Sequence, residues 1–248
     1  MIKTILFDLD GTLLPMDQEQ FVELYFQKLA AKMAYAFDSR QLIRSIWAAT
    51  EAMIKDQGPE RNERVFWKKM EEMYGESILE YVPVFERFYE QEFQAIQKFC
   101  PANPESQTIV ETLKKKYRLM LATNPLFPQI ATYSRIRWAG LDPNDFDLVT
   151  TYENASACKP SLAYYENILR DFDLKPEECV MVGNDVDEDM VARKLGMRTF
   201  LLTDHLINRS NQNIDLFAHG DFQALLAYLK TFEEDQKKTV DFVNGLFF

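Results

Sequence analysis

The chain of 248 residues has a hydrophobic fraction of 47% and a charged fraction of 27%, values typical of a soluble protein with a sizeable core. Its formal net charge of −11 argues against nucleic acid or an anionic membrane as the main partner. No apolar stretch approaches the ~20 residues of a membrane span, and no signal-like leader is recognisable. The three cysteines are widely spaced and odd in number, which argues against a disulfide framework or a zinc site. We therefore expect a cytoplasmic protein with no nucleic-acid or membrane partner.

The first predicted element is an interior strand over Ile2–Phe7, followed closely by two carboxylates, Asp8 and Asp10. In an extended segment, side chains at positions i and i+2 lie on one side, so the two carboxylates share a face. Gly11 permits a backbone turn that is closed to other residues, and Thr12 adds a hydroxyl beside that turn. This arrangement allows one aspartate to attack a substrate while its neighbour handles a proton.

Residues 16 to about 100 contain no convincing strand, and their long amphipathic runs predict four helices. Capping-box patterns at Asp17–Gln20 and at Ser77–Glu80 indicate two helix starts. Breaks between helices are expected at Gly58-Pro59 and at Tyr74-Gly75.

After residue 100 the pattern changes to short apolar strands that alternate with helices. The predicted strands are Tyr117–Ala122, Phe146–Thr150, Cys179–Val182 and Arg198–Leu202. The predicted helices are Pro104–Lys115, Pro128–Ala139, Ser161–Asp171 and Glu188–Leu195. This alternation predicts an α/β fold with a doubly wound parallel sheet covered on both faces. We expect residues 1–15 and 100–248 to form this core domain, residues 16–99 to form an inserted all-helical cap domain, and residues 232–248 to form a surface extension.

Polar side chains follow the carboxyl ends of the predicted strands, where a parallel sheet binds its ligand. Thr123 and Asn124 follow the second strand, and Lys159 lies in the loop before a helix. After the strand that ends at Val182, the chain carries several acids over residues 184–189. Carboxylates, a hydroxyl, an amide and an ammonium group at one edge suit phosphoryl transfer through an aspartyl-phosphate assisted by Mg²⁺.

Each group has a role in such a reaction. Asp8 is the expected nucleophile, and Asp10 would protonate the departing alkoxide and then deprotonate the attacking water. Mg²⁺ held by Asp8 and by carboxylates at 185–189 would neutralise charge as the nucleophile approaches the phosphate. Thr123 and nearby backbone N–H groups would bind phosphate oxygens, while Lys159 offsets the remaining negative charge.

The order D-x-D-G-T, Thr after the second core strand, Lys, then an acidic pair after an apolar strand resembles the haloacid dehalogenase (HAD) superfamily. The resemblance covers essentially the whole chain and implies a Rossmann-like core with a helical cap inserted between the first and second motifs. It implies that the Asp10 main-chain carbonyl also contacts Mg²⁺ and that Asn124 binds phosphate. The phosphate-binding candidates are Asp8, Gly11, Thr123, Asn124 and Lys159. The metal-binding candidates are Asp8, Asp10, Asp185 and Asp189.

The last of these motifs admits two assignments. Family patterns place an acid directly after the glycine, but here Asn184 follows Gly183. Asp185 with Asp189 is the preferred pair, and a shift by one residue would instead place Asn184 and Glu188 at the site.

We predict a Mg²⁺-dependent phosphatase that hydrolyses a small phosphorylated metabolite. A phosphomutase acting on a sugar phosphate stays an alternative, because nothing in residues 16–100 excludes it. A haloalkanoate dehalogenase would lack the second aspartate, so Asp10 argues against that activity. A phosphonate hydrolase would need a cap lysine able to form a Schiff base. In a different class, a non-catalytic module that binds a phospho-ligand is opposed by the intact set Asp8, Asp10, Thr123 and Lys159.

Substrate selection is expected to come from the cap, because the core chemistry is blind to the leaving group. The polar segment over residues 55–62 and the turn at 15–17 are predicted to border the mouth of the site. Lys55 or Arg61 would then meet the substrate, and a solvated loop is the alternative. The sequence does not predict an oligomeric state.

Overall fold

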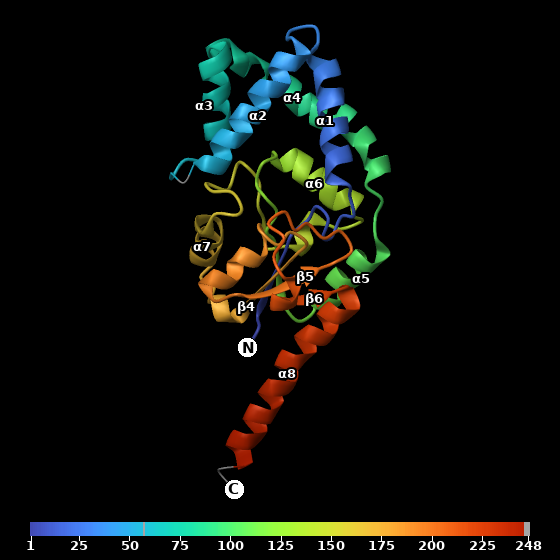
Figure 1. Cartoon of the computed structure of the whole chain (residues 1–248), viewed down its shortest axis with the longest axis vertical. Coiled ribbons are helices and arrows are strands. Elements are labelled where there is room, and N and C mark those ends of the chain that lie inside the picture. The colour runs from blue at the N-terminus through green and yellow to red at the C-terminus, as the bar shows by residue number, and fades with distance from the viewer. Residues whose placement is uncertain (57, 246–248) are drawn as a thin grey trace.

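The computed structural model describes residues 1–56 and 58–245, and its centre is one parallel sheet with the strand order β3-β2-β1-β4-β5-β6 (Figure 1). The strands are β1 (Thr4–Phe7), β2 (Arg118–Leu121), β3 (Leu148–Val149), β4 (Cys179–Gly183), β5 (Arg198–Leu202) and β6 (Ala218–Gly220). In β1, Ile5 and Phe7 belong to one buried cluster and Leu6 to another, so both faces of the sheet are covered. The predicted doubly wound α/β sheet is confirmed.

Helices connect the strands and cover the sheet. The α-helices of this part are α5 (Pro104–Leu113), α6 (Gln129–Trp138), α7 (Leu162–Asp171) and α8 (Phe222–Gly245). The short 3₁₀ helices are η3 (Pro143–Asp145), η4 (Pro176–Glu178), η5 (Met190–Leu195) and η6 (Ile214–Leu216). The helix expected over residues 188–195 is therefore a shorter 3₁₀ turn. Leu246, Phe247 and Phe248 of the predicted C-terminal extension lie outside the described residues.

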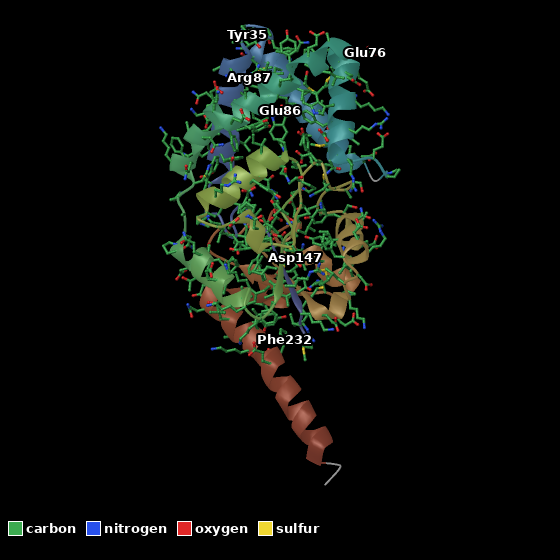
Figure 2. All side chains as sticks on the ribbon, turned by 180° about the vertical axis from the view of Figure 1, so that it is seen from behind. Tyr35, Glu76, Glu86, Arg87, Asp147 and Phe232 are labelled. Atoms are coloured by element: carbon green, nitrogen blue, oxygen red, sulfur yellow. The ribbon has the colours of Figure 1, made fainter. Side chains whose placement is uncertain are left out.

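The described residues between β1 and α5 form helices joined by loops and contain no strand. It contains α1 (Gln18–Met33), α2 (Ser39–Lys55), α3 (Asn62–Tyr74), η1 (Glu76–Tyr81), α4 (Val82–Glu90) and η2 (Glu92–Phe99). Figure 1 shows this block at one end of the molecule, with α8 projecting from the other. From behind, Tyr35 and Glu76 lie at the far end of the block, and Phe232 lies where α8 leaves the core (Figure 2). An all-helical cap inserted into the core is confirmed, while the boundaries at 15/16 and 99/100 stay predictions.

Local capping explains where the cap helices begin and end. Asp17 precedes α1, and its side chain accepts a hydrogen bond from the Gln20 N–H at 3.0 Å. Gly75 ends α3 with φ +77°, so the break expected there is confirmed. The helix start expected at Ser77 is wrong: Ser77 lies inside η1, because Gly75 already forms the junction between the two helices.

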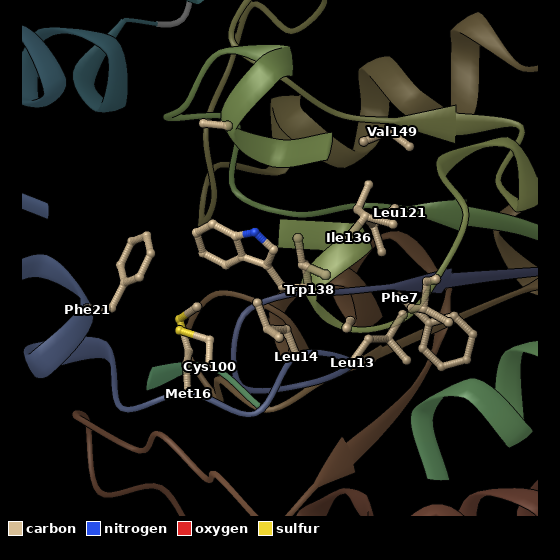
Figure 3. Close-up of a cluster of buried hydrophobic side chains, with 14 of the residues drawn as sticks. Phe7, Leu13, Leu14, Met16, Phe21, Cys100, Leu121, Ile136, Trp138 and Val149 are labelled. Carbon is tan, nitrogen blue, oxygen red and sulfur yellow. The ribbon is translucent and has the colours of Figure 1, made fainter. Parts of the chain in front are cut away.

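A single buried cluster joins the cap to the sheet (Figure 3). It contains Phe7 and Leu121 from the strands, Trp138 from α6 and Phe21 from α1. Its members Met16 and Cys100 lie on the two linkers between the parts. The linkers are therefore held in the core rather than left in solvent, which fixes how the first turn of α1 meets the sheet.

The sequence also argued against a disulfide framework and against membrane spans. Cys100, Cys158 and Cys179 are buried free thiols, as expected. Across residues 1–56 and 58–245 no helix has both the length and the apolar character needed to cross a membrane.

Asn62 forms a second, polar joint between cap and core. Its side chain is fully buried at the start of α3, and its Nδ2 donates to the Pro125 carbonyl and to Cys158 Sγ, both at 3.2 Å. Backbone bonds reinforce the joint, because Asn62 N donates to Ala155 O at 2.9 Å. The N-terminal end of α3 is thus anchored on the loops that follow β2 and β3.

We expect Asn62→Ala to lower the free energy of unfolding by about 1–3 kcal/mol, because it leaves buried acceptors without their donor. The control is Asn144→Ala, since Asn144 is exposed and its side-chain amide donates to Asp142 alone among the described residues, so its effect should stay within about 0.5 kcal/mol. Urea unfolding of the three proteins measures the difference. Equal losses for the two variants would contradict the assigned joint.

Candidate active site

The site lies at the carboxyl ends of three adjacent strands, β2, β1 and β4. Pairing continues one residue past β1, where Asp8 N donates to Val182 O at 2.9 Å and Ala122 N donates to Phe7 O at 2.7 Å. The residues after these strands therefore meet at one edge of the sheet. They line a cavity of about 160 Å³ whose polar lining is Asp8, Asp10, Gln18, Thr123, Asn124, Asn184, Asp185, Glu188 and Asp189.

Lys159 lies behind this cavity between two carboxylates. Its Nζ is 2.9 Å from Asp8 Oδ1 and 2.6 Å from Asp189 Oδ1, and its side chain is 1% exposed. Burial alone would lower the pKa of Lys159, but Asp189 and Asp8 outweigh burial and hold that pKa well above its ordinary value. The backbone N–H of Lys159 also donates to Asn124 Oδ1 at 3.2 Å. The ammonium group is therefore charged and fixed beside the expected nucleophile.

Asp189 reaches Lys159 because Gly183 leaves room for it. A Cβ on Gly183 would lie 2.0 Å from Asp189 Oδ2, so any side chain there would displace the carboxylate. The same carboxylate accepts a hydrogen bond from Asp185 N at 3.0 Å, which closes the turn after β4. Burial raises the pKa of Asp189 to about 6 although Lys159 acts in the opposite direction.

Gly11 permits a similarly close approach on the other side of the cavity. Its φ is +83°, and a Cβ there would lie 2.3 Å from Asn184 Nδ2. Asn184 is held by two bonds: Thr12 Oγ1 donates to its Oδ1 at 2.9 Å, and its Nδ2 donates to His205 O at 2.7 Å. Gly11 does not line the cavity itself, so its contribution is to let Asn184 enter the lining.

Asp10 pairs with Arg135, a residue that the sequence motifs did not single out. Arg135 Nη1 donates to Asp10 Oδ2, and the arginine is fully buried on α6. Its guanidinium lies over the ring of Phe127, 4.6 Å from the centroid. Asp10 Oδ1 is buried and has no partner among the described residues. Asp10 is among the residues that line the cavity, and Arg135 engages the other oxygen of its carboxylate.

A second arginine that the motifs missed, Arg209, holds Asp185. Its Nη1 lies 2.6 Å from Asp185 Oδ2, while Asp185 Oδ1 accepts from the backbone N–H groups of Asp187 and Glu188. Burial raises the pKa of Glu188 to about 7, and its Oε2 accepts from Asn124 Nδ2 at 3.0 Å. Both predicted pairs, Asp185 with Asp189 and Asn184 with Glu188, thus line the cavity.

The donor chemistry of the cavity fits a hard divalent cation. Five carboxylates line it and three cations pair with them, namely Lys159, Arg135 and Arg209, which leaves two formal negative charges. No three acidic, histidine or cysteine side chains converge in metal-binding geometry within the described part of the chain. The carboxylates of Asp8, Asp10 and Asp185 each pair with a cation instead.

The predicted turn at residues 15–17 lies at the site, whereas Lys55 and Arg61, the two cations expected to meet the substrate, do not. Met16 and Gln18 line the cavity. Lys55 is exposed and pairs with Glu51 at 2.6 Å, and Arg61 Nη1 donates to the Asn154 carbonyl. Neither Lys55, which is the last residue of α2, nor Arg61 is among the residues that line the cavity.

Comparison with known proteins gives one family. A family model described as haloacid dehalogenase-like hydrolase matches residues 2–196. A glyceraldehyde 3-phosphate phosphatase from Methanocaldococcus jannaschii is 26% identical over 242 residues, covering 95% of this chain and 100% of that relative. Another, from Methanothermobacter thermautotrophicus, is 29% identical over 111 residues, covering 44% of this chain and 48%, about half, of that relative. The solved structure of the HAD-hydrolase YfnB from Bacillus subtilis bound to magnesium has a TM-score of 0.54 at 15% identity, covering 92% of this chain and 99% of that one, a likeness of fold alone.

We expect Gly11→Ala to destabilise the protein more than Gly196→Ala. Both glycines have positive φ, so both variants carry a backbone cost of about 1 kcal/mol, but only Gly11 has Asn184 in the way. At Gly196 an added Cβ would meet nothing closer than Pro176 at 3.9 Å. Urea unfolding measures both free energies, and equal values would contradict the close approach of Asn184.

Proposed function

We propose that this protein, which belongs to the haloacid dehalogenase-like hydrolase family, is a phosphatase that hydrolyses a small phosphomonoester. The proposed reaction proceeds through an aspartyl-phosphate on Asp8 and uses Mg²⁺ as cofactor. The observation that carries the proposal is the position of Asp8. Its carboxylate lines the cavity, and the charged Lys159 ammonium contacts it from behind at 2.9 Å. A carboxylate held in this way can attack an electrophile in the cavity without leaving its own charge unbalanced.

The reaction follows from the groups around Asp8. One oxygen of the Asp8 carboxylate attacks phosphorus, and the bond between phosphorus and the alcohol oxygen breaks with its electron pair on that oxygen. Asp10 in its acid form gives the departing alkoxide a proton through Oδ1, the oxygen that has no partner among the described residues. Water then attacks the phosphorus, Asp10 takes its proton, and the Asp8 carboxylate leaves. Arg135 holds the other Asp10 oxygen, so the same oxygen serves in both steps.

Mg²⁺ would be held by Asp8, by the Asp10 carbonyl and by Asp185 or Asp189, both of whose carboxylates already have each oxygen engaged by protein groups. The carboxylate oxygens that line the cavity are ligands that a hard divalent cation prefers, and such a cation would offset the charge of the phosphate. Thr123, Asn124 and Lys159 are the proposed phosphate-binding groups. The relatives named glyceraldehyde 3-phosphate phosphatase support a phosphorylated metabolite as substrate.

The experiment that tests the proposal measures hydrolysis of p-nitrophenyl phosphate and of a phosphometabolite panel that includes glyceraldehyde 3-phosphate. Asp8→Asn should reduce kcat by at least about 10³-fold, because an amide cannot form the acyl-phosphate. Asp204→Asn is the matched control, since Asp204 is exposed and outside the cavity, and it should leave kcat unchanged. Undiminished turnover by Asp8→Asn would exclude the mechanism.

Asp10→Asn should separate the two steps. p-Nitrophenolate needs no proton to depart, so the first step persists, while the attack of water loses its base. Stopped-flow absorbance should therefore show a burst of about one p-nitrophenolate per enzyme followed by slow turnover. A linear trace without a burst, at wild-type rate, would contradict the assigned role.

Metal removal gives an independent result. Dialysis against EDTA should abolish hydrolysis and added Mg²⁺ should restore it, because the phosphate would otherwise face excess negative charge. Full activity in metal-free buffer would contradict Mg²⁺ as the cofactor. The role of Asp8 as nucleophile would still be tested separately by Asp8→Asn.

A further inference from the structure

A second and larger cavity, of about 460 Å³, lies between the cap helices and the core loops after β2 and β3. Helices α1 to α4 form its cap wall, and residues 126–130 with 152–153 form its core wall. It shares Val22, Leu126 and Phe127 with the catalytic cavity, so the two are contiguous.

The walls of this cavity are mainly aromatic. Nine aromatic side chains line it, among them Trp47, Phe66, Trp67 and Tyr152. Tyr25 and Tyr89 are joined by a hydrogen bond between their hydroxyls at 3.0 Å and stack with centroids 6.3 Å apart, so that part of the wall is fixed before any ligand binds. Aromatic faces attract cations as well as apolar groups.

The charged groups of the cavity are all negative. Glu63, Glu86, Glu90 and Glu153 line it, and no lysine, arginine or histidine of the described residues does. None of the four forms an ion pair with a described residue, and Glu153 instead caps α6 by accepting from Gln129 N at 2.8 Å. Burial raises the pKa of Glu63, and the charges of Glu153 and Glu86 raise it further, so these three carboxylates lie close enough to repel one another. Figure 2 labels Glu86 within the helical block.

We propose that this cavity binds the alcohol part of the substrate and that this part is an organic cation, a protonated or quaternary amine. The inference rests on the proposed phosphatase function and names its substrate class: a phosphomonoester of an amino alcohol with a single phosphate. The aromatic faces and unpaired carboxylates both attract a positive charge. A second phosphate or a carboxylate on the alcohol would face four glutamates and no cation, which disfavours bisphosphates and phosphorylated acids.

The test compares two esters of the same shape, choline phosphate and 3,3-dimethylbutyl phosphate. Choline phosphate carries a quaternary nitrogen where the second ester has a quaternary carbon, so only the first has a cationic alcohol. The wild type should show a kcat/KM at least about tenfold higher for choline phosphate, the range of a desolvated cation–π and carboxylate interaction. The double variant Glu63→Gln/Glu86→Gln should lose most of this preference, measured as the ratio of kcat/KM for the two esters. Glu76→Gln is the matched control, because Glu76 is exposed on η1 and outside the cavity.

A binding measurement separates failure of this inference from failure of the proposed function. Isothermal titration of choline into the Asp8→Asn protein should show binding that the double variant weakens at least about fivefold. Equal kcat/KM for the two esters with normal hydrolysis of p-nitrophenyl phosphate would overturn the cation inference and leave the phosphatase intact. If the protein hydrolyses no phosphomonoester, the proposed phosphatase function is wrong. The choline titration alone would then decide whether the cavity binds a cation. Preference for glyceraldehyde 3-phosphate over choline phosphate would also overturn the inference.

Discussion

The charge of Lys159, buried between Asp8 and Asp189, is the interaction on which the site depends. Three segments that are distant in the chain meet at this ammonium group: the end of β1, the loop before α7 and the turn after β4. Removing one partner from such a buried ion pair costs about 3–5 kcal/mol, because the remaining charge stays out of water. The position of Asp8, the proposed nucleophile, is therefore fixed by the fold itself. Pre-organisation of this kind is what electrostatic catalysis requires.

Two glycines set how closely the polar groups can gather around that charge. Gly183 leaves the space that the Asp189 carboxylate fills, and Gly11 leaves the space that the Asn184 amide fills. Larger residues at either position would push a polar side chain out of the lining and would weaken its bonds to Asp185 N or to Thr12. The motif glycines are thus needed for packing at least as much as for turning the chain.

The sheet and the motif residues were predictable because they depend on local sequence. Buried parallel strands are continuous apolar runs, and their carboxyl ends meet at one edge by the rule of the fold. β6 was missed because Ala218-His219-Gly220 is a short edge strand with no apolar run. Arg135 was missed because a lone arginine on a helix is ordinarily solvated, and only the tertiary fold buries it against Asp10 and Phe127. The cap cavity depends on four helices and two loops coming together, which no single segment encodes.

The two adjoining cavities differ in how their negative charge is balanced. At the catalytic cavity, lysine and arginine side chains lie behind the carboxylates, and what they leave unbalanced suits a metal and a phosphate. At the cap cavity no cation of the described residues opposes the glutamates, of which Glu63 and Glu153 are partly buried and Glu86 and Glu90 are exposed. A substrate with an anionic end and a cationic end would satisfy both at once, and its orientation would be fixed by charge as well as by shape. Because a reversed molecule would place like charges together at both ends, this arrangement would select against the wrong pose as strongly as it favours the right one.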